Sequence, residues 1–123
     1  MKKINDRPLV AIDVDDTLIY WQHKPGRRSV SIPVDNHDEM FDVHEGHVEA
    51  LKKHAARGHT ILVWSAGGSD WAEAVIKALQ LEEYVDIIMP KPNWIYDDIS
   101  PNEFLPNNLY IHEEADDSTP EIS

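Results

Sequence analysis

The sequence predicts a single α/β domain built around a parallel sheet. The chain has 123 residues, which is enough for one compact core and too short for two. Apolar runs that stop abruptly at polar residues alternate with two segments of helical periodicity. This alternation is typical of a parallel sheet with helices packed on it. Ligands of such sheets bind at the carboxyl ends of the strands, so a functional site is expected there.

Five short apolar runs are the predicted strands. Their hydrophobicity is continuous and not alternating, which favours strands buried on both faces. The last of them is expected at the edge of the sheet. The five runs are residues 9–12, 60–64, 85–89, 94–96 and 109–111.

Two segments between these runs have the pattern of half-buried helices. Residues 45–57 place apolar side chains on one face, and Gly58 supplies a left-handed stop. Residues 69–80 repeat apolar positions at helical spacing, and Asp70 with Glu73 predicts a capping box at their start.

The segment of residues 19–44 interrupts the alternation and is expected to form a hairpin or flap over the end of the first strand. It carries turn residues on both sides of a short β-like run at residues 30–32. It also contains Arg27 and Arg28 in an otherwise acidic chain, and Trp21. The arginines could grip a substrate phosphate or form an exposed loop pair. Trp21 is a candidate for recognition, whereas the other three tryptophans are expected in the core.

Composition limits the function classes. The formal net charge of −12 disfavours binding to duplex nucleic acid or to an anionic membrane. The absence of cysteine excludes disulfides, zinc thiolate sites and thiol catalysis. Residues 1–112 are the expected domain, and the acidic residues 113–123 are expected to form a disordered tail. With no apolar stretch of about 20 residues, the expectation is a soluble cytoplasmic protein without a membrane span.

Polar residues that follow the predicted strands form a candidate site, because these strand ends face one crevice of a parallel sheet. Several carboxylates gathered there repel one another unless a cation neutralises them, and Mg²⁺ with oxygen ligands suits the place. The residues are Asp13 and Asp15 after the first strand, Ser65 after the second, Lys91 after the third, and Asp97 and Asp98 after the fourth.

Together with Mg²⁺, these residue types suit phosphoryl transfer. Asp13 can act as a nucleophile that gives an acyl phosphate, and Asp15 can act as general acid and base. Ser65, Lys91 and the backbone N–H groups of residues 66–68 (Ala66, Gly67 and Gly68) can hold phosphate oxygens near a helix start. A flexible strand-to-helix turn is an equal interpretation of the two glycines.

The order of these motifs resembles that of the haloacid-dehalogenase-like phosphatases, over about residues 9–98. It begins with the run Ile12-Asp13-Val14-Asp15-Asp16-Thr17-Leu18 and continues with a strand-terminal Ser, a Lys and an Asp-Asp pair. The resemblance implies a Rossmann-like fold with Asp13 as nucleophile, Asp15 as acid/base, Ser65 as phosphate holder and Lys91 as charge stabiliser. It also implies Mg²⁺ held by Asp13, the Asp15 carbonyl and Asp97, with Asp98 in support.

Two departures from the family pattern stand out. Glu103 is the only candidate for a further acidic residue after the Asp-Asp pair. A large cap domain is missing, so the chain resembles a capless member whose open site a homodimer could close.

The expected function is therefore hydrolysis of a phosphomonoester, with a nucleotide or other small phosphate ester favoured as substrate. Two other classes are a receiver-type phospho-acceptor domain and a catalytically silent binding protein. A zinc site at His44 and His47 is a minor alternative, since no third ligand has a recognisable spacing.

Overall fold

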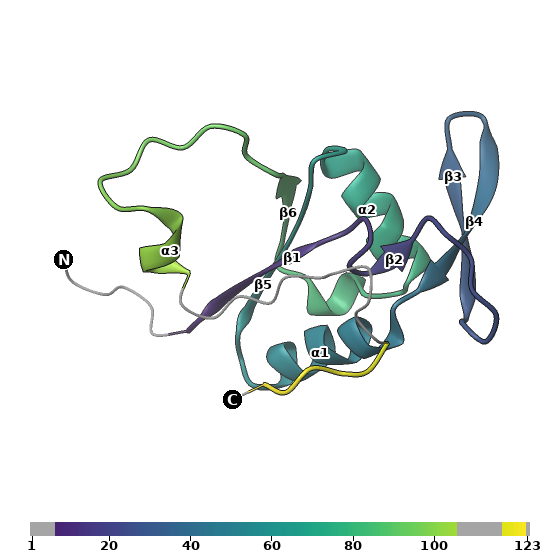
Figure 1. Cartoon of the computed structure of the whole chain (residues 1–123), viewed down its shortest axis with the longest axis horizontal. Helices are drawn as coiled ribbons and strands as arrows, with labels where there is room; N and C mark the ends of the chain where they lie inside the picture. The colour runs from purple at the N-terminus through teal and green to yellow at the C-terminus, as the bar shows by residue number, and fades with distance from the viewer. Residues whose placement is uncertain (1–6, 106–116, 123) are drawn as a thin grey trace.

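The computed structural model describes residues 7–105 and 117–122. A parallel sheet in the order β1-β5-β6 is made by β1 (Leu9–Asp13), β5 (Thr60–Ser65) and β6 (Ile87–Pro90). The connections are α1 (Glu45–Ala56) and α2 (Ser69–Ala78), the latter followed by the 3₁₀ turn η1 (Glu82–Tyr84). Figure 1 shows this small α/β architecture, which confirms the predicted fold class.

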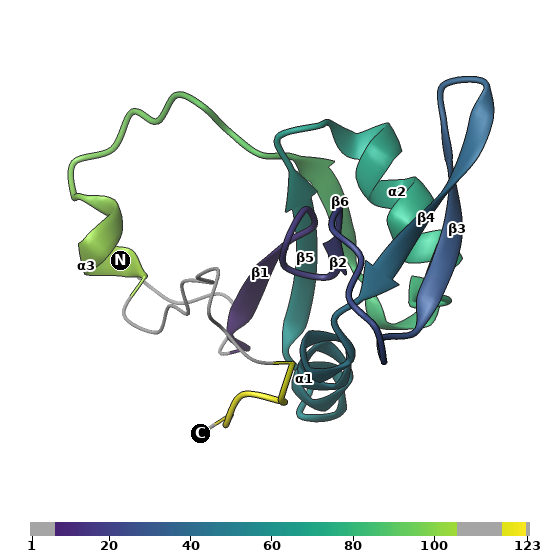
Figure 2. The same cartoon turned by 45° about the vertical axis from the view of Figure 1, so that its right-hand side comes forward.

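The flap predicted for residues 19–44 is a second, antiparallel sheet. It consists of β2 (Ile19–Tyr20), β4 (His37–Val43) and β3 (Ser29–Val34), in that order. The hairpin of β3 and β4 projects beyond the parallel sheet, as Figure 2 shows. Its inner side is not free, because β3 contacts α2 and the buried side chains of Ile32 and Phe41 join the core.

The core lies between the parallel sheet, the two helices and the base of the small sheet. Each fully buried Leu, Ile or Phe side chain contributes about 1.5–3 kcal/mol relative to exposure. The largest fully buried apolar side chains are Phe41, Leu18, Ile19, Ile32, Leu51, Ile61, Ile76 and Leu81. They come from both sheets, so the flap is an integral part of the domain.

Both predicted helices are present, but the predicted capping box of α2 is wrong. The N-cap is Gly68, at φ 101°, and no side chain caps the helix. The helix begins at Ser69, so Asp70 lies inside the first turn, where its charge meets the positive end of the helix dipole.

The predicted strand at residues 94–96 is also wrong. Residues 91–100 form an exposed connection to the short helix α3 (Pro101–Phe104), and Trp94 is 79% exposed instead of lying in the core. Pro90 and Pro92 have no N–H for a sheet ladder, and a run of three apolar residues is too short to distinguish a strand from an apolar loop. The predicted run at residues 109–111 lies outside the described residues.

Burial on both faces is found for β5 but not for β1. Leu9 is 54% exposed and Ala11 is exposed, whereas Val10 and Ile12 are partly buried. Among the described residues, β1 pairs with β5 alone, so its other edge has no strand partner there. In the described part of the chain, no helix is long and apolar enough to cross a membrane.

Candidate active site

The register of the parallel sheet brings three of the predicted residues to one edge. Asp13 is level with Trp64 in the next strand, and Ser65 is level with Pro90 in the third. The backbone N–H of Lys91 donates to the Ser65 carbonyl at 2.8 Å. The Lys91 ammonium Nζ lies 3.9 Å from Asp13 Oδ1, and both side chains are partly exposed.

A tight loop after β1 turns the chain from Asp13 toward the flap. The Val14 carbonyl accepts hydrogen bonds from the N–H groups of Thr17 and Leu18, at 3.2 and 2.9 Å. Asp16 takes a left-handed conformation with φ 57°, which Asp tolerates better than most residues. The Thr17 hydroxyl donates to Asp13 Oδ2 at 3.4 Å. Thr17 therefore orders the loop and orients the Asp13 carboxylate.

The carboxylate of Asp15 is held by three donors. Trp21 Nε1 and Trp71 Nε1 both donate to Oδ1, at 2.8 and 3.0 Å. The Ser65 hydroxyl donates to Oδ2 at 3.4 Å. Asp15 therefore joins the group of Asp13, Ser65 and Lys91, as the sequence predicts.

The turn after β5 is shaped by its two glycines. The N–H of Gly67 donates to Ser65 Oγ at 3.0 Å, and the N–H of Gly68 donates to the Ser65 carbonyl at 3.1 Å. A Cβ on Gly67 would lie 3.1 Å from Trp71 Cδ1, so a larger residue would crowd the indole there. The Ser65 side chain is fully buried at the base of this turn, while Ala66 and Gly67 are exposed.

The start of α1 supports the Asp13–Leu18 loop from behind. His47 Nδ1 carries the hydrogen and donates to the Thr17 carbonyl at 2.6 Å, because a carbonyl can only accept. The backbone N–H of His44 donates to the Leu18 carbonyl at 2.9 Å, and its ring caps the helix by accepting from the His47 N–H. The two rings are stacked, with centroids 3.4 Å apart. The sequence had suggested these histidines only as a minor zinc alternative.

Asp97 and Asp98 lie apart from this group. The connection between β6 and α3 arcs away from the parallel sheet in both Figure 1 and Figure 2. Asp97 is exposed, and its pKa lies below the ordinary value, first because it shares a hydrogen bond with the Asp98 carboxyl, which then carries the proton, and next because it accepts from the Ile99 backbone N–H. Glu103 accepts from the Ser100 N–H in the capping box of α3. Within residues 7–105 and 117–122, no three His, Asp or Glu side chains form a group that could hold a metal ion.

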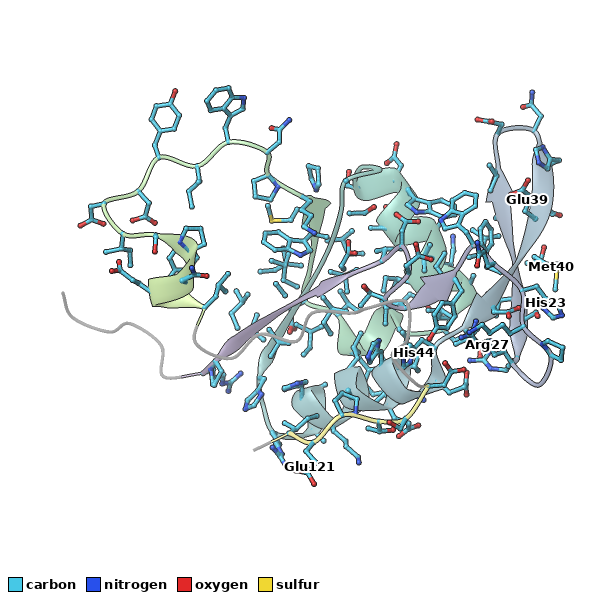
Figure 3. The ribbon with its side chains drawn as sticks, in the orientation of Figure 1. His23, Arg27, Glu39, Met40, His44 and Glu121 are labelled. Atoms are coloured by element: carbon cyan, nitrogen blue, oxygen red, sulfur yellow. The ribbon has the colours of Figure 1, made fainter. Side chains whose placement is uncertain are left out.

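The two arginines predicted to bind phosphate have carboxylate partners within the chain. Arg27 Nε donates to Asp117 Oδ2 at 2.8 Å, and its guanidinium lies 3.6 Å from the centroid of the Tyr20 ring. Arg28 forms an ion pair with Glu45 at 2.8 Å. Figure 3 shows Arg27 pointing toward the start of α1, near His44. Phosphate binding by either arginine stays a prediction.

Asp117 belongs to the acidic segment predicted to be disordered. It accepts hydrogen bonds from Arg27 and from the Tyr20 hydroxyl, the latter at 2.9 Å. The hydrogen bond from Arg27, followed by that from Tyr20, outweighs the effect of burial and holds the pKa of Asp117 below its ordinary value. Residues 113–116 lie outside the described part of the chain.

Comparison with known protein families gives a match over most of the chain. The family model of NLI interacting factor-like phosphatases matches residues 8–106, which include Asp13, Asp15, Ser65 and Lys91. No curated protein matches the chain. The match spans most of the 123 residues and confirms the resemblance to haloacid-dehalogenase-like phosphatases. The chain therefore belongs to the NLI interacting factor-like phosphatase family.

Proposed function

We propose that this protein hydrolyses phosphate monoesters through an aspartyl-phosphate intermediate on Asp13. One observation carries the proposal: the nucleophile, a lysine and a second carboxylate meet at the carboxyl ends of parallel strands. Lys91 Nζ lies 3.9 Å from Asp13 Oδ1, and Asp15 shares a hydrogen bond with Ser65 at the same edge. Membership of a phosphatase family supports the same reaction class.

In the first step a carboxylate oxygen of Asp13 attacks phosphorus, and the bond from phosphorus to the alcohol oxygen breaks. Asp15 gives its proton to the departing alcohol. In the second step Asp15 takes a proton from water, whose oxygen attacks the phosphorus of the acyl phosphate. Inorganic phosphate leaves and the Asp13 carboxylate is restored. Lys91 stabilises the negative charge on the transferred phosphoryl group.

The strand ends have the donor chemistry for Mg²⁺. With Asp15 ionised, the carboxylates of Asp13 and Asp15 outweigh the single positive charge of Lys91. The group then has a net negative charge and offers hard oxygen donors. We propose that Asp13 and the main-chain carbonyl of Asp15 hold the ion. When bound, Mg²⁺ would neutralise charge on the phosphate and on the aspartates.

We also propose that Asp97 holds the ion with Asp98 in support, as the family resemblance implies, which requires the exposed connection after β6 to approach Asp13. Hydrogen exchange tests this: Mg²⁺ with a phosphate analogue such as beryllofluoride should slow exchange at residues 94–98. Unchanged exchange in the loaded protein would contradict this approach of Asp97 to the ion.

The substrate class that we propose is a small phosphate ester, with nucleotides included. The chain's charge of −12 disfavours duplex nucleic acid, whereas the open site expected without a large cap also admits bulky phosphates unless a second subunit closes it. A panel of phosphorylated metabolites, nucleotides and phosphopeptides, assayed for phosphate release with Mg²⁺, would rank these classes.

The test of the reaction itself is Asp13→Asn. We expect release of p-nitrophenol from p-nitrophenyl phosphate to fall by more than about 10³-fold, because the nucleophile is lost. Asp16→Asn is the matched control: Asp16 lies in the same loop, is exposed, and has a left-handed φ that Asn accepts. Near-normal turnover by Asp13→Asn would refute the proposal. No turnover by the wild type on the whole panel would favour a silent binding protein.

A further inference from the structure

Two tryptophans donate hydrogen bonds to one oxygen of the proposed acid/base. Trp21 Nε1 lies 2.8 Å from Asp15 Oδ1 and Trp71 Nε1 lies 3.0 Å from the same atom. They come from different parts of the fold, since Trp21 follows β2 in the small sheet and Trp71 lies in the first turn of α2. The two ring centroids are 5.9 Å apart.

A third aromatic side chain, from the core, anchors this pair. Phe41 of β4 is buried and meets both indoles edge to face, with centroid separations of 4.8 Å to Trp21 and 5.6 Å to Trp71. Such edge-to-face pairs are favoured by the quadrupoles of the rings. The position of each indole N–H is therefore set by packing against a buried residue.

The chemistry of indole determines how the hydrogen bonds from Trp21 and Trp71 act on Asp15. An indole N–H can donate a hydrogen bond and cannot accept one, and each carboxylate oxygen offers two lone-pair sites. With both sites of Oδ1 occupied by Trp21 and Trp71, a proton on Asp15 has to sit on Oδ2. That oxygen is the one 3.4 Å from the hydroxyl of Ser65, the residue to which the family resemblance assigns phosphate binding.

We propose that Trp21 and Trp71 are positioning residues that hold Oδ1 of Asp15 and leave Oδ2 as the oxygen that delivers and receives the proton. This inference rests on the proposed acid/base role of Asp15. It also assigns a task to the small sheet, because through Trp21 this sheet aligns the acid with the leaving group.

The experiment replaces the indole N–H while keeping an aromatic ring, in Trp21→Phe, Trp71→Phe and the double variant. kcat/KM is measured for a series of aryl phosphates from 2,4-dinitrophenyl to phenyl phosphate. Because kcat/KM reports the steps up to departure of the first product, it depends on how well Asp15 protonates the leaving oxygen. A good leaving group needs little protonation and a poor one needs much.

We expect kcat/KM of each single variant to fall by about 10-fold or more on phenyl phosphate and by less than about 3-fold on 2,4-dinitrophenyl phosphate. The larger fall is part of the about 10²–10⁴-fold that general acid catalysis contributes. In the double variant, kcat/KM should fall most steeply as the pKa of the leaving group rises. Tyr20→Phe is the matched control. Tyr20 is the neighbour of Trp21 and also donates to an aspartate, but its partner is Asp117, so its leaving-group dependence should equal that of the wild type.

Two further results separate this inference from the proposed function. In Asp15→Asn, kcat/KM should itself fall steeply as the pKa of the leaving group rises. If it does and the tryptophan variants keep the wild-type slope, or lose activity equally on all substrates, the positioning role is refuted and the acid role stands. If Asp15→Asn shows no steep dependence, the acid role fails and this inference fails with it. Should Trp71→Phe not fold, the half-exposed Trp21 still provides the comparison.

Discussion

Asp117→Asn tests whether the C-terminal segment stabilises the domain. The Asp117 carboxylate accepts two hydrogen bonds from Arg27, at 2.8 and 3.0 Å, and one from the Tyr20 hydroxyl at 2.9 Å. The same guanidinium stacks on the Tyr20 ring. An asparagine would lose the charge and would turn an NH₂ group toward one of these donors.

The expected magnitude follows from the burial of the two partners. The Arg27 side chain is 9% exposed, whereas that of Asp117 is 40% exposed. Breaking a buried pair costs about 3–5 kcal/mol, while exposed pairs contribute about 0–1 kcal/mol. Arg27 also keeps Asp42 at 3.8 Å, so its charge would not be left alone. We therefore expect the free energy of unfolding to fall by about 2 kcal/mol.

Urea unfolding of the wild type, Asp117→Asn, Arg27→Met and the double variant measures this value and the coupling between the two side chains. Glu121→Gln is the matched control, because it removes a charge from the same segment at an exposed position and should change stability by less than about 0.5 kcal/mol. Figure 3 shows Glu121 away from Arg27.

The pH dependence gives an independent check. The pKa of Asp117 is lower in the folded protein, chiefly because of the hydrogen bond from Arg27. The stabilisation is therefore present above the ordinary value of 3.8 and is lost as the pH falls through the lowered pKa. The difference between wild type and Asp117→Asn should shrink below about pH 4.

Two results would refute this reasoning: a stability of Asp117→Asn within about 0.5 kcal/mol of the wild type, or a coupling energy near zero. The same variants test the role of Arg27. We expect Arg27→Met to unfold at lower urea with an unchanged KM, whereas a raised KM at unchanged stability would support phosphate binding.

Three other perturbations test neighbouring parts of the structure. Gly46→Ala should release residues 117–122, because a Cβ there would collide with the Ser118 backbone; faster proteolysis of the C-terminus would show this, and an unchanged rate would contradict it. His47→Ala should lower the free energy of unfolding by about 1–3 kcal/mol and also lower kcat, because it removes the donor to the Thr17 carbonyl beside Asp15; loss of stability in urea at constant kcat would contradict the link to the loop. Burial, then the hydrogen bond to Asp117, raises the pKa of Tyr20 to about 12, so the neutral form is favoured in the folded state. The stabilisation that the neutral Tyr20 hydroxyl provides should be complete below about pH 10 and lost as the pH rises from there to about 12. The free energies of unfolding of the wild type and Tyr20→Phe should therefore converge in alkaline solution. A difference between them that stays constant with pH would contradict this linkage.

The ends of β1 and β5 could be located from the sequence because each apolar run stops at one polar residue, although only β5 is buried on both faces. The apolar run before Asp13 and that before Ser65 are continuous and stop at one polar residue. The relative position of the two parallel strands is then restricted, since both strands must end at the same edge for the helices to pack. The meeting of Asp13, Ser65 and Lys91 follows from these local patterns.

The contacts that refine the site could not be read in this way. Trp71 lies 56 positions from Asp15 and Asp117 lies 90 positions from Arg27, and no spacing rule links residues so far apart. An indole N–H or a guanidinium finds its partner only after the core has fixed the backbone. The run at residues 94–96 shows that a short local pattern can also mislead. Three apolar residues do not specify a strand unless a neighbouring strand pairs with them. The sequence by itself therefore determined the α/β class and the edge of the sheet where Asp13 lies, while Asp13 as nucleophile stays a proposal. The tertiary structure decided which side chains hold Asp15 and which carboxylate Arg27 meets, because those choices depend on packing between distant segments.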